Sequence, residues 1–115
     1  MIIGNYNELE WKAMTGEGIK DAFVKVVVSP KEGWDDYVMR IFKLAPGGNT
    51  PKHTHEWPHI NYIIKGKGTL HLNGKENEIF AGSYAFVPSN ELHQFTNIGK
   101  EDLEFICIVP TVGHK

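Results

Sequence analysis

From residue 22 onward, short runs of β-forming residues alternate with turn-forming residues. The runs are rich in Val, Ile, Phe, Tyr and Thr, whose branched or aromatic side chains pack well on a pleated surface. The expected strands are 23–28, 37–44, 52–55, 60–64, 68–72, 76–80, 84–87, 93–96 and 103–109. Short strands at this spacing, without a long amphipathic helix among them, indicate an all-β sandwich or barrel.

Gly, Pro and Asn residues mark the turns between these runs. The expected turns include 29–33, 45–49, 65–68, 88–90 and 97–99. Asn73-Gly74 is the strongest hairpin signal, because both residues tolerate the positive φ angles of a type I′ turn.

The length of 115 residues fits one domain. We expect a single barrel domain at residues 23–115, preceded by an N-terminal segment, 1–22, that forms either an edge strand or a dimer contact. An exposed apolar edge at 23–28 would invite pairing with a second copy, so a homodimer is expected.

The charge balance argues against two classes of partner. The chain has 12 basic and 14 acidic residues spread along its length, and a net charge of -2. Without a basic block, neither nucleic acid nor a membrane surface is expected as a partner. The start of the chain lacks a signal-peptide pattern, no apolar stretch is long enough to span a bilayer, and Cys107 is the single cysteine. These features predict a cytoplasmic protein.

Three histidines lie within seven residues, in the segment His53-Thr54-His55-Glu56-Trp57-Pro58-His59. On a strand, His53 and His55 would share one face about 6.6 Å apart, close enough to bind one ion. His59 would lie about 13 Å beyond His55 on a straight strand. Pro58 cannot donate a ladder hydrogen bond, so a turn at 56–58 is expected to bring His59 back towards the first pair.

His93 follows the expected turn at 88–90 and is the candidate for a fourth ligand. The other two histidines are not expected to contribute. His71 sits in an alternating strand-like run, and His114 lies in the C-terminal tail.

Two sequence motifs resemble those of the cupin superfamily. The first family motif is G-x5-H-x-H-x3,4-E-x6-G, and this chain matches it with histidine in place of the usual glutamate. The matching residues are Gly47, His53, His55, His59 and Gly66. The second motif is G-x5-P-x-G-x2-H-x3-N. It is matched by Gly82, Pro88, Asn90, His93 and Asn97. Asparagine replaces the middle glycine and tolerates a left-handed backbone, so the turn is expected to survive.

The resemblance implies a double-stranded β-helix, the jelly-roll barrel of cupins, with one metal ion. The chain resembles in particular the small single-domain cupins that have four histidine ligands and an H-x-H-x-W-x-H-like segment. The alternative explanation for histidine in place of the family's glutamate at position 59 is that the motif has decayed and the metal has been lost. Histidine is itself a metal ligand, however, and its spacing in the motif is kept. Glu56 is a possible substitute ligand, although its parity relative to His55 points it away from the site.

Four neutral imidazoles would leave the full charge of a divalent ion uncancelled, which favours an anionic or enolate-like small molecule. Imidazole ligands suit Fe, Ni, Cu or Zn, and Mn remains an alternative. Because a protonated imidazole cannot bind, metal loss is expected below about pH 6.5.

Four further residues are candidates for the pocket around the ion. Phe95 shares the parity of His93 and is expected to line the cavity. Asn61 either contacts the site or faces solvent, and Trp57 either walls the mouth or packs in the core. Cys107 is either a buried small hydrophobe or a thiol near the metal.

Two classes of function remain open from the sequence. The first is a metal-dependent enzyme acting on a small molecule, by dioxygenase-like oxidation or by isomerisation or decarboxylation at a Lewis acid. The second is a module that binds or senses a sugar or metabolite, with a structural metal. Cupins perform many functions on one scaffold, so the fold does not choose between them.

Overall fold

The computed structural model describes residues 1–114 as a β-rich chain with three short 3-10 helices. The strands are β1 (Lys12–Ala13), β2 (Lys20–Val28), β3 (Tyr37–Asn49), β4 (His59–Lys65), β5 (Lys67–Leu72), β6 (Lys75–Phe80), β7 (Tyr84–Val87), β8 (Gln94–Asn97) and β9 (Leu103–Pro110). The 3-10 helices are η1 (Tyr6–Glu8), η2 (Pro30–Glu32) and η3 (Thr111–Gly113). In this part of the chain, no helix is long and apolar enough to cross a membrane.

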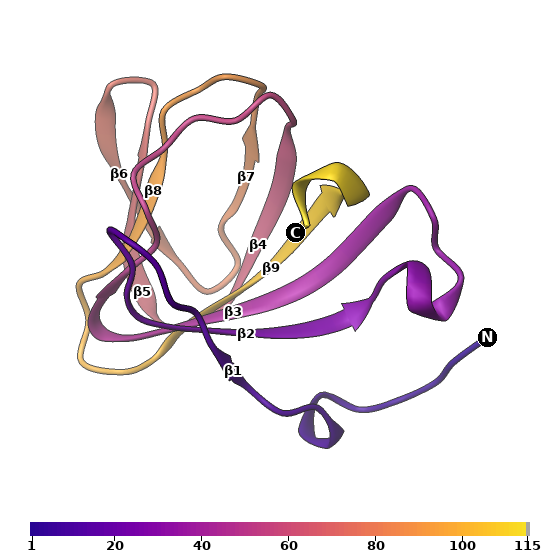
Figure 1. Cartoon of the computed structure of the whole chain (residues 1–115). Coiled ribbons are helices and arrows are strands. Elements are labelled where there is room, and N and C mark those ends of the chain that lie inside the picture. Colours follow the sequence, from indigo (N-terminus) through magenta and orange to yellow (C-terminus); the bar gives the residue numbers. More distant parts are fainter. Residues whose placement is uncertain (115) are drawn as a thin grey trace.

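The strands form one antiparallel sheet that curls into a nearly closed barrel (Figure 1). The order across the sheet is β6-β5-β8-β3-β9-β4-β7, and β2 and β1 add to β3 at one side. Neighbours in space are mostly distant in sequence, as in a jelly roll. The all-β prediction is confirmed, and the architecture is consistent with a double-stranded β-helix.

Strand β3 passes through the turn that the sequence predicts at 45–49. Opposite it, Ala22 of β2 pairs with Leu44, but Lys20 pairs with Asn49, so residues 45–48 bulge against a single residue of β2. Asn49 then pairs with Thr96 of β8. The predicted turn is therefore a bend within one long strand, which carries the chain from one side of the barrel to the other.

The hairpin prediction is confirmed. Asn73 and Gly74 have φ angles of 57° and 73° and join β5 to β6. Positive φ at both central positions gives the twist that matches two antiparallel strands.

The strand predicted at 52–55 is wrong. Residues 50–58 lie outside the strands, apart from an isolated bridge between His53 and His93. Pro51 and Pro58 flank this segment and lack the N–H that a ladder requires. The histidine segment is therefore a loop, and β4 begins at His59.

The apolar core lies inside the barrel and includes three phenylalanines. The rings of Phe42 and Phe105 lie 5.4 Å apart, and Phe95 stacks on Phe105 at 4.2 Å between centroids. Leu44 and Ile63 are fully buried beside them. Burying each such side chain contributes about 1.5–3 kcal/mol, so this core holds the barrel together.

The N-terminal segment packs on the outer face of β2 (Figure 1). Lys25 points outward from β2, and its Nζ lies 3.7 Å from the centroid of the Tyr6 ring and 4.6 Å from that of Trp11. The same Nζ donates a hydrogen bond to the carbonyl of Tyr6 at 2.9 Å. These contacts fasten the segment beside β1, so that Met14 reaches the interior.

Candidate metal site

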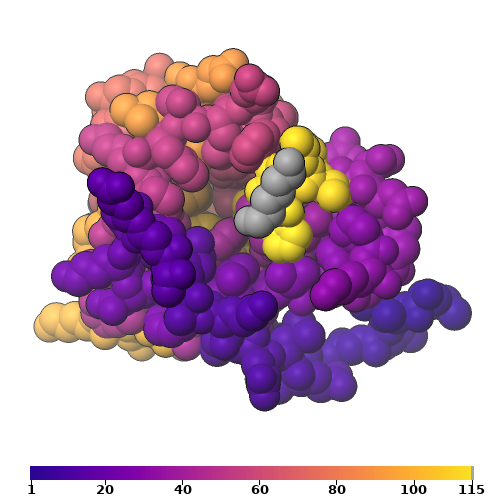
Figure 2. Space-filling model, viewed as in Figure 1, coloured from indigo at the N-terminus to yellow at the C-terminus, as the bar shows by residue number. Residues whose placement is uncertain are grey.

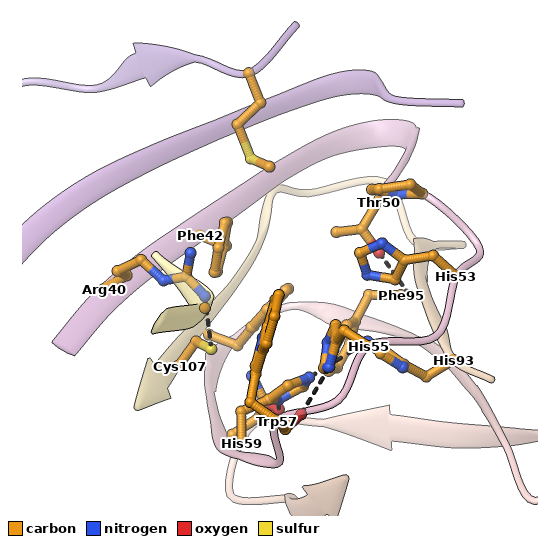
Figure 3. Close-up of a pocket in the computed structure, with 15 residues that line it drawn as sticks. Arg40, Phe42, Thr50, His53, His55, Trp57, His59, His93, Phe95 and Cys107 are labelled. Carbon is orange, nitrogen blue, oxygen red and sulfur yellow. Dashed lines mark hydrogen bonds between the residues drawn. The ribbon is translucent and has the colours of Figure 1, made fainter. Parts of the chain in front are cut away.

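Four histidine rings converge beside a cavity of the barrel (Figure 3). His53 and His55 come from the loop at 50–58, His59 begins β4, and His93 immediately precedes β8. The His93 centroid lies 4.9 Å from that of His53, 4.7 Å from that of His55 and 5.0 Å from that of His59. One ring nitrogen from each of His53, His55 and His93 lies within 4.8 Å of the others. His59 and His93 are buried, His55 is half-buried and His53 is exposed.

Backbone hydrogen bonds hold the two histidine segments together. The N–H of His53 donates to the carbonyl of His93, and the N–H of His93 donates to the carbonyl of His53, both at 3.1 Å. The N–H of Asn90 donates to the carbonyl of His55 at 2.7 Å. Asn90 adopts a φ of 65°, so asparagine does take the left-handed conformation expected where the cupin motif has glycine.

Three of the rings are held by hydrogen bonds at Nδ1. The Nδ1 of His55 lies 2.7 Å from the carbonyl of Trp57, and that of His93 lies 2.8 Å from the carbonyl of Glu91. The Nδ1 of His59 lies 2.7 Å from Oδ1 of Asn61. Each of these oxygens can only accept, so Nδ1 carries the proton and Nε2 keeps its lone pair. This is how metal-binding histidines are oriented in proteins.

The arrangement of the Nε2 atoms fits a metal ion. The Nε2 atoms of His59 and His93 are 3.3 Å apart. Two lone pairs this close repel one another unless a cation lies between them. Two nitrogens that each lie about 2.1 Å from one ion are separated by roughly 3.0–3.4 Å in octahedral or tetrahedral geometry. The cluster therefore suggests a site for a divalent transition metal, for which imidazole is a suitable ligand.

Three of the four histidines have a lowered pKa, which favours their neutral form. Burial lowers the pKa of His59 to about 3, with smaller contributions from neighbouring positive charges, while the hydrogen bond to Asn61 opposes the shift. Desolvation of the His53 ring, together with the nearby His93 and His55, lowers the pKa of His53 to about 4, although part of this side chain is exposed. Burial also lowers the pKa of His93. The neutral form, which binds metal, is thus favoured well below the reference value of about 6.5. Protons would compete with metal at lower pH than the sequence alone predicts.

The family model for the cupin domain matches residues 40–109, which are more than half of the chain. The chain belongs to the cupin family. The match runs from β3 through β9 and includes all four converging histidines.

This cupin is similar to proteins with different small-molecule functions. An oxalate-binding protein of Thermotoga maritima is 43% identical over 68 residues, covering 58% of this chain and 56% of that protein. Auxin-binding protein 1 of Arabidopsis thaliana is 40% identical over 75 residues, covering 57% of this chain and 38% of that protein. The chain thus matches less than two thirds of the length of either relative. Among solved structures, the polyketide cyclase RemF of Streptomyces resistomycificus has a TM-score of 0.91 and 26% identity, covering 96% of this chain and 80% of RemF.

A cavity of about 150 Å³ adjoins the histidines of this cupin. In Figure 2, a recess lies between the N-terminal segment, the upper part of the barrel and the C-terminal residues. The structure places all four predicted pocket residues in the cavity wall. These are Trp57, Asn61, Phe95 and Cys107.

Each of these residues has a distinct position in the wall. The Trp57 ring stacks on the His55 ring, with centroids 4.9 Å apart and planes 7° from parallel (Figure 3). Asn61 is buried and contacts His59, so it does not face solvent. Cys107 is buried and points into the barrel, and it is the register partner of Asn61 on the neighbouring strand β4. Burial raises the pKa of the Cys107 thiol, which favours its neutral form.

Seven residues of the wall are absent from the sequence prediction, among them Arg40, Met14 and Gly113. Arg40 could have been found, because it occupies an inward position of a strand whose other inward residues are apolar. Met14 and Gly113 reach the cavity from the two ends of the chain. No periodicity or motif marks them, because their approach depends on how the terminal segments pack.

The cavity wall does not include the possible substitute ligand Glu56, nor the two histidines that were not expected to contribute, His71 and His114. Glu56 is exposed and does not line the cavity. His71 pairs with Glu76 across the β5–β6 hairpin, with 2.6 Å between Nδ1 and Oε1. His114 follows η3 and does not belong to the histidine cluster.

Proposed function

We propose that this cupin binds one divalent transition metal through His53, His55, His59 and His93, and that the adjoining cavity holds a small organic ligand. The observation that carries the proposal is the convergence of unprotonated Nε2 atoms, with Nδ1 held by Trp57, Glu91 and Asn61. The proposal places the chain in the four-histidine subgroup of small cupins. Mn, Fe, Ni, Cu and Zn are the candidate ions.

The proposed activity is metal-dependent chemistry on a small molecule. When bound, the ion would supply Lewis-acid chemistry or, for a redox-active metal, oxidation. The four imidazoles add no negative charge, so they leave the site attractive to an anion or an enolate-like group. The described cavity wall has no Asp or Glu, so no carboxylate of the wall is placed to act as a general base.

Oxygenation, isomerisation and decarboxylation of small acids or diketones are the reactions that this site supports best. The test is oxygen consumption and product formation by the metal-loaded protein across catechols, β-diketones and α-keto acids. We expect turnover of at least one class, and loss of that turnover in His59→Ala. No turnover of any class by fully metallated protein would contradict the enzymatic proposal.

A second function, binding without turnover, is favoured by the similarity to an oxalate-binding protein and an auxin-binding protein. In that case, a small acid would raise the melting temperature of the metal-loaded protein without forming a product. Thermal shift and product analysis on the same samples separate the two functions.

We also propose that the chain forms a homodimer through the outer face of β9, β4 and β7. Five large apolar side chains are exposed there, four of them line a shallow groove, and no charged residue among residues 1–114 lines that groove. The five are Ile60, Tyr62, Ile64, Tyr84 and Phe86. Their exposed surface is roughly 600 Å² per protomer, which approaches the ~800 Å² per partner of a specific interface. The run at 23–28 is a weaker candidate, because β2 is flanked by β1 and β3.

A further inference from the structure

Within residues 1–114, Arg40 is a cation inside the barrel without a counter-charge. It projects inward from β3 between the buried residues Val38 and Phe42 and lines the cavity beside the histidines. Its Nη2 donates a hydrogen bond to Sγ of Cys107 at 3.4 Å, and a neutral thiol is only a weak acceptor. Within residues 1–114, no carboxylate lies within 4.0 Å of the guanidinium.

One atom of Arg40 has no hydrogen-bond partner among residues 1–114. In the described part of the chain, Nε of Arg40 is the only buried side-chain nitrogen or oxygen that lacks one. A buried donor without an acceptor costs free energy, and native proteins keep few of them. The cation lies against the Phe42 ring, 4.9 Å from its centroid, which fixes the guanidinium but satisfies none of its N–H groups.

Strand register connects Arg40 to the histidine cluster. Arg40 of β3 lies directly opposite Cys107 of β9, and Cys107 lies opposite Asn61 of β4. All three point into the barrel, and Asn61 holds His59. Because neighbouring strands are about 4.8 Å apart, this polar row spans roughly 10 Å between the backbones of Arg40 and Asn61. Arg40 and the histidines therefore border the same cavity from two sides (Figure 3).

We propose that Arg40 is the residue that selects an anionic ligand, and that the ligand is a small carboxylate held between Arg40 and the histidine cluster. The inference rests on the proposed metal site and specifies its ligand class. A planar carboxylate fits the guanidinium fork with two parallel hydrogen bonds. The cavity of about 150 Å³ limits the ligand to a size near that of benzene, about six to eight non-hydrogen atoms.

The test is isothermal titration of the metal-loaded protein with oxalate, malonate and pyruvate, and with oxamide as a neutral analogue of oxalate. Arg40→Met removes the positive charge but keeps a long side chain. Arg40→Lys keeps the positive charge but lacks the guanidinium that can donate two parallel hydrogen bonds. Lys43→Met is the matched control, because Lys43 lies on the same strand but its Nζ packs on the outer rings of Trp11 and Phe23. Metal content is measured on every sample.

We expect Arg40→Met to bind the carboxylates about 10- to 100-fold more weakly with its metal content unchanged, because a charge-assisted hydrogen bond is lost. Arg40→Lys should recover part of the affinity for carboxylates, and Lys43→Met should bind them like the wild type. The affinity for oxamide should be the same in Arg40→Met and the wild type. Arg40→Met should also fold without loss of melting temperature in the absence of ligand, because the unpaired Nε is removed.

Three results would overturn the inference. They are equal affinity of wild type and Arg40→Met for carboxylates, equal affinity of wild type for oxalate and oxamide, and no binding of any of the three acids. In each case, a normal metal content would leave the metal site standing. A wild type without metal would instead contradict the proposed function, and the inference would fall with it.

Discussion

Replacing Asn61 with leucine tests whether the hydrogen bond to His59 serves the metal site. Asn61 and His59 are only 4% and 7% exposed, so water cannot replace the lost acceptor. A buried donor left unpaired costs about 1–3 kcal/mol of unfolding free energy. For a domain of this size, that corresponds to a melting temperature lower by roughly 4–8 °C per kcal/mol. Because the ring is no longer oriented, metal affinity should fall about 10- to 100-fold.

The matched control is Asn77→Leu. Asn77 of β6 donates hydrogen bonds to the carbonyls of Leu70, Leu72 and Lys75 and lies outside the cavity wall. We expect it to lose stability comparably but to bind metal like the wild type. Thermal unfolding of the metal-free proteins and competition with a chromophoric chelator measure the two effects. Unchanged metal affinity in Asn61→Leu, with stability reduced as in the control, would refute the reasoning.

Three other perturbations have defined outcomes. The pKa of His59 is lowered to about 3 and that of His93 is lowered too. The unfolded chain therefore binds more protons below pH 6.5, and His59 alone should cost the metal-free protein about 1.4 kcal/mol of unfolding free energy per pH unit as the pH falls from 6.5 towards 4. Denaturant titrations showing constant stability over that range would contradict this. A Cβ at Gly113 would overlap the Trp57 ring, so Gly113→Ala should shift Trp fluorescence and weaken metal binding severalfold, whereas an unchanged spectrum and affinity would exclude this contact. Phe86→Lys should convert a dimer to a monomer in size-exclusion chromatography with light scattering, and a monomeric wild type would end the dimer proposal.

The strand pattern predicted most of the barrel because local residue types determine it. Branched and aromatic runs recur as β2 and β4 to β9, and Asn73-Gly74 forms its hairpin. The two errors concern the path of the chain between strands. Residues 45–48 look like a turn but bulge out of a continuous β3, and Pro51 prevents the His53 segment from forming a strand. Both outcomes depend on which distant strand is available for pairing.

The spacing of the motifs predicted that the four histidines converge, and in the structure their rings lie close together. The geometric reason differs from the one inferred. His53 and His55 approach one another through a loop held by His93 and Asn90, not through the parity of a strand. Arg40 could have been recognised as a charge at an inward position, but its unpaired Nε is visible only once the neighbouring strands are known.

The most direct test of the four-histidine site is the metal content of protein purified without a histidine tag, measured by elemental analysis. The wild type should carry about one transition-metal ion per chain, and His59→Ala should carry much less. His71→Ala, whose histidine pairs with Glu76 outside the cluster, should match the wild type. A wild type that is free of metal and also fails to bind added iron, manganese, nickel, copper or zinc would contradict the site.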